Sequence, residues 1–107
     1  MRVIDFRVRP PARGFADTIM FQQIERTARM SKDVGIDVGA SFRNRSASML
    51  IEEMDRAGIE RAVMPGRVNS TIGSVPNDDL DAIANDYPGR FVPLVAIDPR
   101  DRKAALP

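Results

Sequence analysis

The run FVPLVAID at residues 91–98 constrains the fold more than any other stretch of this sequence. It is almost continuously apolar, which is typical of a parallel strand that is covered on both of its faces. A shorter run of the same kind, RAVMP, occupies residues 61–65. Between these runs, a polar loop over residues 66–75 leads to a helix for which Asn77 is the expected N-cap. Two apolar strands joined by a helix predict a parallel βαβ unit.

The N-terminal half of the sequence predicts one more strand and one helix before a loop. Residues 2–8 are rich in β-branched and aromatic side chains, and Pro10-Pro11 ends this expected strand. Apolar residues recur every four positions from Phe15 to about Met30, which predicts a single amphipathic helix. Residues 31–45 contain two glycines and no clear period, so we expect a loop with room for a helical turn.

Two further helices complete the expected order of elements. One covers residues 49–57, with Ser46 or Ser48 as its N-cap and Gly58 as the left-handed residue that closes it. The other begins at Asp101 and has hardly started where the sequence ends. The fold class is therefore α/β, with parallel βα units in a single segment over residues 1–107. Three strands do not close a barrel, so the segment is either a small open domain or the beginning of a larger one.

The amino-acid composition argues against several classes of function. The 16 basic and 15 acidic residues nearly cancel, so we expect neither a nucleic acid nor a membrane as partner. The sequence has no cysteine and no histidine, which removes disulfides, thiolate metal sites, the commonest metal ligand and the commonest general base. No signal sequence and no apolar run of the ~20 residues that a membrane span needs are present, so a cytoplasmic location is expected.

Three segments together resemble the amidohydrolase-related family of metal-dependent hydrolases and decarboxylases. They are VIDFRVRPP at the N-terminus, MLIEEMDRAGIERAVMPGR in the middle, and VPNDDLDAIANDYPGRFVPLVAIDP near the end. The resemblance covers roughly residues 2 to 103 and implies the first three strands of a TIM (β/α)8 barrel, which typically needs about 250 residues. It implies that this sequence is the N-terminal third of such a barrel.

The resemblance also implies a metal site that this sequence does not support. In the family, the first strand ends Asp-x-His-x-His, and both histidines bind zinc or another divalent metal. Here the two positions hold Arg7 and Arg9. A guanidinium is always protonated and has no lone pair to offer a cation. We therefore expect no metal ligand from this strand, and metal-dependent hydrolysis is in doubt.

The same arginines suggest a site for an anion. Active sites of barrel enzymes lie at the carboxyl ends of the strands, where paired guanidinium groups match a carboxylate or a phosphate. We expect Arg7, Arg9 and Arg67 to converge there on a small anionic substrate, with Gly66, Asn69, Ser70 and Thr71 as nearby donors. We expect Asp5 to hold an arginine by an ion pair. Asp98, at the end of the third strand, is the candidate catalytic or orienting carboxylate.

Each of these residues also has a purely structural interpretation. Arginines on an edge strand are commonly just solvated, and the polar loop that holds Arg67 is ordinary loop chemistry. Asp98 precedes a proline, which is common in a turn that ends a strand.

Three functions fit the sequence. The first is a barrel enzyme that hydrolyses or decarboxylates a small anionic compound. This chain would be one part of that enzyme and is expected to be inactive alone. The second is a metal-free descendant of such a barrel that binds or assembles without catalysis. The third is a self-contained interaction domain, which would be a stable monomer. Unpaired sheet edges argue against the third, so we expect a homo-oligomer or pairing with a complementary chain.

Overall fold

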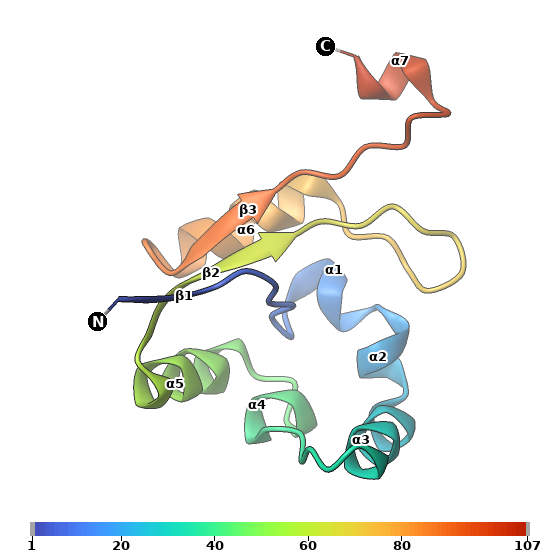
Figure 1. Ribbon diagram of the computed structural model, residues 1–107. Coiled ribbons are helices and arrows are strands. Elements are labelled where there is room, and N and C mark those ends of the chain that lie inside the picture. The colour runs from blue at the N-terminus through green and yellow to red at the C-terminus, as the bar shows by residue number, and fades with distance from the viewer. Residues whose placement is uncertain (1, 107) are drawn as a thin grey trace.

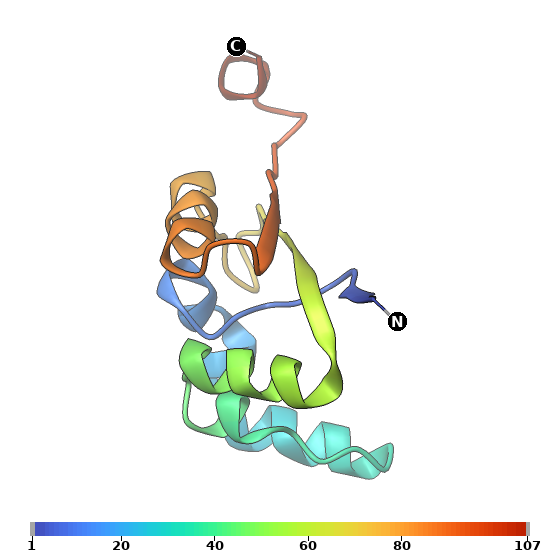
Figure 2. The same ribbon diagram turned by 90° about the vertical axis from the view of Figure 1, so that its left-hand side faces the viewer.

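The computed structural model describes residues 2–106 and contains one parallel sheet with its helices on a single face (Figure 1). The strands are β1 (Val3–Asp5), β2 (Ile59–Pro65) and β3 (Phe91–Leu94), and they lie side by side in that order. Both pairs are parallel, as the alternation of strands and helices predicts. Figure 2 shows the sheet nearly edge-on, with helices on one side of it and none on the other.

Strand β1 is shorter than the sequence predicts. Its register with β2 shifts between Val3 and Ile4, and the ladder ends at Asp5. There the Asp5 carboxylate accepts a hydrogen bond from the backbone N–H of Arg7 at 2.9 Å, which turns the chain. The backbone returns to β2 where Val8 N–H donates to Val63 O at 2.9 Å. The prediction of a strand over residues 2–8 was therefore wrong in its second half, because a side chain of the strand itself competes for the ladder.

The single helix expected between Phe15 and Met30 is three short helices. They are α1 (Arg13–Ala16), α2 (Ile19–Gln22) and α3 (Ile24–Asp33). Thr18 separates the first two, because its backbone is extended and its buried hydroxyl donates to Phe15 O at 2.6 Å. The break lets Phe15 and Phe21, each 1% exposed, enter the same core. Gln23, with φ −120° and ψ 58°, makes the second break.

Residues 31–45 hold the last turn of α3 and one short helix, α4 (Ala40–Arg43). The next helix, α5 (Ala47–Ala57), is capped as predicted, because the Ser46 side chain accepts from Met49 N–H and Gly58 closes it at φ 71°. Glu53 of α5 fastens α4 by accepting hydrogen bonds from Ser41 N–H at 2.9 Å and Ser41 Oγ at 2.6 Å. Burial alone would raise the pKa of Glu53, but the hydrogen bonds from Ser41, the charge of Arg56 and the backbone of Ala40 together outweigh it and lower this pKa.

Helix α6 (Asn77–Asp86) starts one residue away from its expected cap, since Pro76 is the N-cap. The Asn77 side chain instead bridges to the segment after β3: it donates to Ala96 O and accepts from Ala96 N–H, both at 3.0 Å. The strand predicted over residues 91–98 ends at Leu94, and the chain beyond it leaves the sheet. Helix α7 (Arg102–Ala105) then begins as predicted, with Asp101 accepting from Ala104 N–H at 3.1 Å.

The hydrophobic core lies between the sheet and the helices that cover it. Helix α5 packs against β2, and α6 packs against β3. The core residues are Phe15, Phe21, Met54, Ala62, Met64, Val75, Leu80, Ile83 and Phe91. On the opposite face, Ile4, Val92 and Leu94 are 49%, 39% and 51% exposed. We refer to these three residues as the open face. The prediction that residues 91–98 are covered on both faces was thus wrong for the described residues, in which helices cover only one face.

Within residues 2–106, no helix is both long enough and apolar enough to cross a membrane.

Candidate functional site

Three arginines line one pocket where the first two strands end. Arg7 and Arg9 follow β1, and Arg67 follows β2 by two residues. Together with Pro65, Gly66 and Ile72 they surround a hollow of about 370 Å³, which we call the arginine pocket. An adjoining hollow of about 340 Å³ is lined by Arg7, Val8, Arg9 and Met20. The structure therefore brings together the three arginines that the sequence predicts to converge, and the carboxyl ends of parallel strands are what place them there.

The arginine pocket carries positive charge that the chain does not neutralise. Within residues 2–106, no carboxylate forms an ion pair with Arg7, Arg9 or Arg67. Arg9 is half-buried, and burial, followed by the positive charges of Arg67 and Arg7, lowers its guanidinium pKa. Arg9 Nη1 lies 3.9 Å from Met20 Sδ. Because guanidinium groups keep their proton, this arrangement offers charged hydrogen-bond donors whose chemistry suits an anion.

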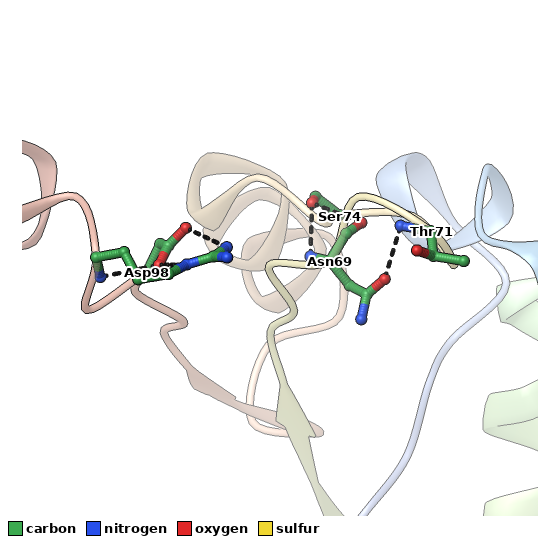
Figure 3. A network of polar contacts seen from close by, with 5 residues as sticks. Asn69, Thr71, Ser74 and Asp98 are labelled. Atoms are coloured by element: carbon green, nitrogen blue, oxygen red, sulfur yellow. Dashed lines mark hydrogen bonds and ion pairs between the residues drawn. The ribbon is translucent and has the colours of Figure 1, made fainter.

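The loop between β2 and α6 is tied down by its own side chains, which fixes Arg67. Val75 N–H donates to Arg67 O at 2.9 Å. Asn69 Oδ1 accepts from Thr71 N–H at 2.8 Å, and Asn69 N–H donates to Ser74 Oγ at 2.9 Å (Figure 3). Asn69 Oδ1 also accepts from Ile72 N–H at 2.9 Å. Asn69 and Thr71 were predicted to be donors toward the site. The structure uses them inside the loop, and neither lines the arginine pocket.

Gly66 joins β2 to Arg67 and has no room for a side chain. Its N–H donates to Leu94 O at 2.7 Å, which holds the ends of β2 and β3 together. A Cβ at this position would lie 3.0 Å from Leu80 Cδ1, 3.1 Å from Leu94 O and 3.2 Å from Ala96 N. Gly66 was predicted only as a backbone donor, whereas the structure also packs it so closely that a larger residue would have to displace its neighbours.

The two candidate carboxylates act within their own turns. The expected ion pair of Asp5 with an arginine is absent from residues 2–106, because its carboxylate accepts from the backbone N–H of Arg7. Asp5 thus positions the chain that carries Arg7. Asp98 accepts from Arg100 Nε at 3.0 Å, Arg100 Nη2 at 2.9 Å and Arg100 N–H at 3.0 Å (Figure 3). The Arg100 side chain and backbone lower the pKa of Asp98. This geometry favours the structural interpretation of Asp98.

Comparison with known proteins identifies the larger architecture. No model of a known protein family matches this chain, and no curated protein matches it. A solved structure, that of an uncharacterized TIM-barrel protein from Bordetella bronchiseptica, matches with a TM-score of 0.91 and 38% sequence identity over 98% of this chain. The fold is a partial TIM barrel. This chain spans 37% of the length of that neighbour. The match supports the predicted barrel but not membership of the amidohydrolase-related family.

The partial barrel allows the position of the arginine pocket to be compared with the active sites of TIM-barrel enzymes. In TIM-barrel enzymes the active site is built at the carboxyl ends of the strands, which is where the arginine pocket lies. The amino ends of the strands hold a different hollow, of about 420 Å³, lined in part by Glu60, Arg61 and Arg90. Arg90 there pairs with Asp55 at 2.7 Å and donates to Glu60 O at 3.0 Å. The charge of Arg90 is therefore neutralised, and in TIM barrels this end typically contributes to stability.

The residues of this partial barrel do not fit the divalent metal that the resemblance implies. Arg7 and Arg9 stand where the family has its metal-binding histidines, and neither can donate a lone pair. Among residues 2–106, no three acidic side chains gather in a way that fits a metal ion. The donor chemistry of the arginine pocket suits an anion and repels a cation.

Four residues that line the two hollows were not predicted to do so, namely Val8, Met20, Pro65 and Ile72. Met20 lies within the helix predicted between Phe15 and Met30, and Ile72 lies within a loop that was considered only for its polar groups. The signal that was available for Ile72 is an apolar side chain in the polar stretch NSTIGS.

Proposed function

We propose that the arginine pocket is the anion-binding part of the substrate site of a TIM-barrel enzyme that acts on a small carboxylate or phosphate compound. The observation that carries the proposal is three arginines around one pocket at the strand ends, without an ion-pair partner within residues 2–106. A bound carboxylate or phosphate accepts several charge-assisted hydrogen bonds from such a cluster and relieves the repulsion among the guanidinium groups.

The reaction that we propose for the whole protein is hydrolysis or decarboxylation, which rests on the resemblance of the sequence to the amidohydrolase-related family. In such a reaction the arginines bind the anionic group and orient the compound. The residues that line the arginine pocket include no general acid or base that titrates near neutral pH. Catalytic groups therefore have to come from residues outside this lining, and we expect the 107-residue chain alone to bind without turnover.

A calorimetric titration tests this proposal. We expect inorganic phosphate and acetate to bind the chain at low ionic strength, with an affinity that falls as salt is added, because salt screens the contact between charges. Acetamide has nearly the shape of acetate but no charge, and we expect it not to bind. Equal binding of acetate and acetamide, or no binding of either anion, would contradict the proposal.

The open face favours a second candidate function, which is binding or assembly without catalysis. Ile4, Val92 and Leu94 form an apolar sheet surface that helices do not cover within residues 2–106. Apolar patches of this kind commonly mark association surfaces. We propose that this face pairs with a second copy of the chain or with a complementary chain.

Sedimentation velocity tests that association. We expect the purified 107-residue chain to sediment as a dimer or a larger species, and we expect Val92→Lys to shift it toward the monomer by placing a charge on the open face. A chain that sediments as a monomer and unfolds in one cooperative step would argue against this second function.

A further inference from the structure

We propose that the anion bound by the arginine pocket carries an apolar group, which occupies a second hollow beside the pocket. This inference rests on the proposed function, and it specifies the class of ligand as an amphipathic carboxylate or phosphate. The second hollow measures about 260 Å³ and lies between α2, α3 and the loop that follows Arg67. Four of its lining residues are apolar, namely Ile19, Met20, Met30 and Ile72, and the other three are Gln23, Arg26 and Thr27. We call it the apolar hollow.

The apolar hollow borders the arginine pocket and shares lining residues with it. Ile72 lines both of them, and Met20 lines both the apolar hollow and the adjoining space around Arg7 and Arg9. The contact of Arg9 Nη1 with Met20 Sδ at 3.9 Å marks the boundary between the charged and the apolar part. A ligand whose anionic group contacts the arginines therefore has its substituent directed along Met20 and Ile72.

The walls of the apolar hollow are held in place by hydrogen bonds to backbone carbonyl groups. Ile19 N–H donates to Ile72 O at 3.2 Å, which ties α2 to the loop. Thr27 Oγ1 donates to Met20 O at 3.2 Å, which ties α3 to α2. Two of the lining side chains are methionines, which adapt to ligands of different shape. Gln23, where the chain breaks between α2 and α3, is one of the residues that line the hollow.

Calorimetric titration of the full chain with acetate, butyrate and hexanoate tests this inference. If the apolar hollow takes the substituent, the affinity rises by about fourfold for each added methylene group. Met30→Gln places a polar group in the hollow at a side chain that is 60% exposed, so the fold tolerates it. We expect this variant to weaken hexanoate binding by at least fivefold and to leave acetate binding unchanged. Val34→Gln, at an exposed apolar residue outside the hollow, is the matched control and should change neither.

The outcomes separate this inference from the proposed function. If acetate and phosphate bind but the affinity does not rise from acetate to hexanoate, the inference about the apolar hollow is wrong and the proposal for the arginine pocket stands. Failure of every anion to bind would overturn both. A third variant has methionine in place of Arg7, Arg9 and Arg67. If hexanoate binds this variant as well as it binds the unmodified protein, its hydrocarbon part adsorbs without help from the arginines, and the inference is wrong.

Discussion

Replacing Arg9 by methionine is expected to weaken phosphate binding by roughly tenfold to a hundredfold, the loss that follows from one or two charge-assisted hydrogen bonds. Arg9 is half-buried, as is Arg67, and it contacts Met20, so a methionine fills its space without adding a polar group. The variant also removes the repulsion that Arg9 experiences from Arg67 and Arg7. We therefore expect its free energy of unfolding to be equal to or higher than that of the unmodified chain.

The test is specific because the phosphate affinity is expected to fall while the free energy of unfolding does not. Phosphate affinity is measured by calorimetry, and stability is measured by urea denaturation followed by circular dichroism. Arg61→Met removes the same charge from an exposed position at the other end of β2, and it controls for the change in net charge. An equal loss of affinity in both variants would mean that phosphate responds to overall charge only. Unchanged affinity in Arg9→Met would remove Arg9 from the site.

The elements that the sequence predicts well are those whose local signals agree with their packing. Helix α5 has a serine that caps it at Ser46, an apolar side that contains Met54, and Gly58 where a left-handed residue is needed. The apolar run of β2 is buried at Ala62, Val63 and Met64. The parallel order of the strands follows from the helices between them, because a parallel connection needs a crossover.

The N-terminal segment is predicted poorly because tertiary contacts override its periodicity. Apolar residues spaced by four predict one helix, but Phe15 and Phe21 are both buried only when the chain breaks at Thr18. The hydroxyl of Thr18, which is 1% exposed, donates to Phe15 O, and the Thr18 N–H donates to the same carbonyl at 3.0 Å, so Thr18 itself holds the turn at the break. No pattern in the sequence separates a helix with Thr18 in its interior from two helices with Thr18 between them.

The candidate site was likewise predicted only in part. Parallel strands place their carboxyl ends at one edge, so the positions of Arg7, Arg9 and Arg67 along the sequence suffice to predict that they meet. Spacing does not show which polar groups are consumed by their own turns, as Asn69 and Asp98 are. Short polar side chains in loops often form hydrogen bonds with the neighbouring backbone, and the amino-acid composition of a loop does not show which of them do so. This competition between backbone and ligand decides which side chains remain free to bind a ligand.

Replacing Gly66 by alanine is expected to lower the free energy of unfolding by about 1–3 kcal/mol, which is typical of overpacking, and to weaken phosphate binding as well. The new Cβ would press on Leu94 O and Ala96 N, which are backbone atoms, and on Leu80, which is fully buried. The end of β2 then has to move away from β3, which lengthens the 2.7 Å hydrogen bond from Gly66 N–H to Leu94 O. Arg67 follows Gly66 directly and moves with it.

Leu80→Ala distinguishes local displacement from general loss of stability. Leu80 is fully buried beneath Gly66 and does not line the arginine pocket, so its truncation is expected to cost about 2–5 kcal/mol and to leave the guanidinium groups in place. We expect Leu80→Ala to bind phosphate normally at urea concentrations where it is folded, and Gly66→Ala to bind at least fivefold more weakly under the same conditions. Normal phosphate affinity in a destabilised Gly66→Ala variant would show that the position of Arg67 does not depend on the junction of β2 and β3. The anion site would then rest on Arg7 and Arg9, which approach the arginine pocket from β1.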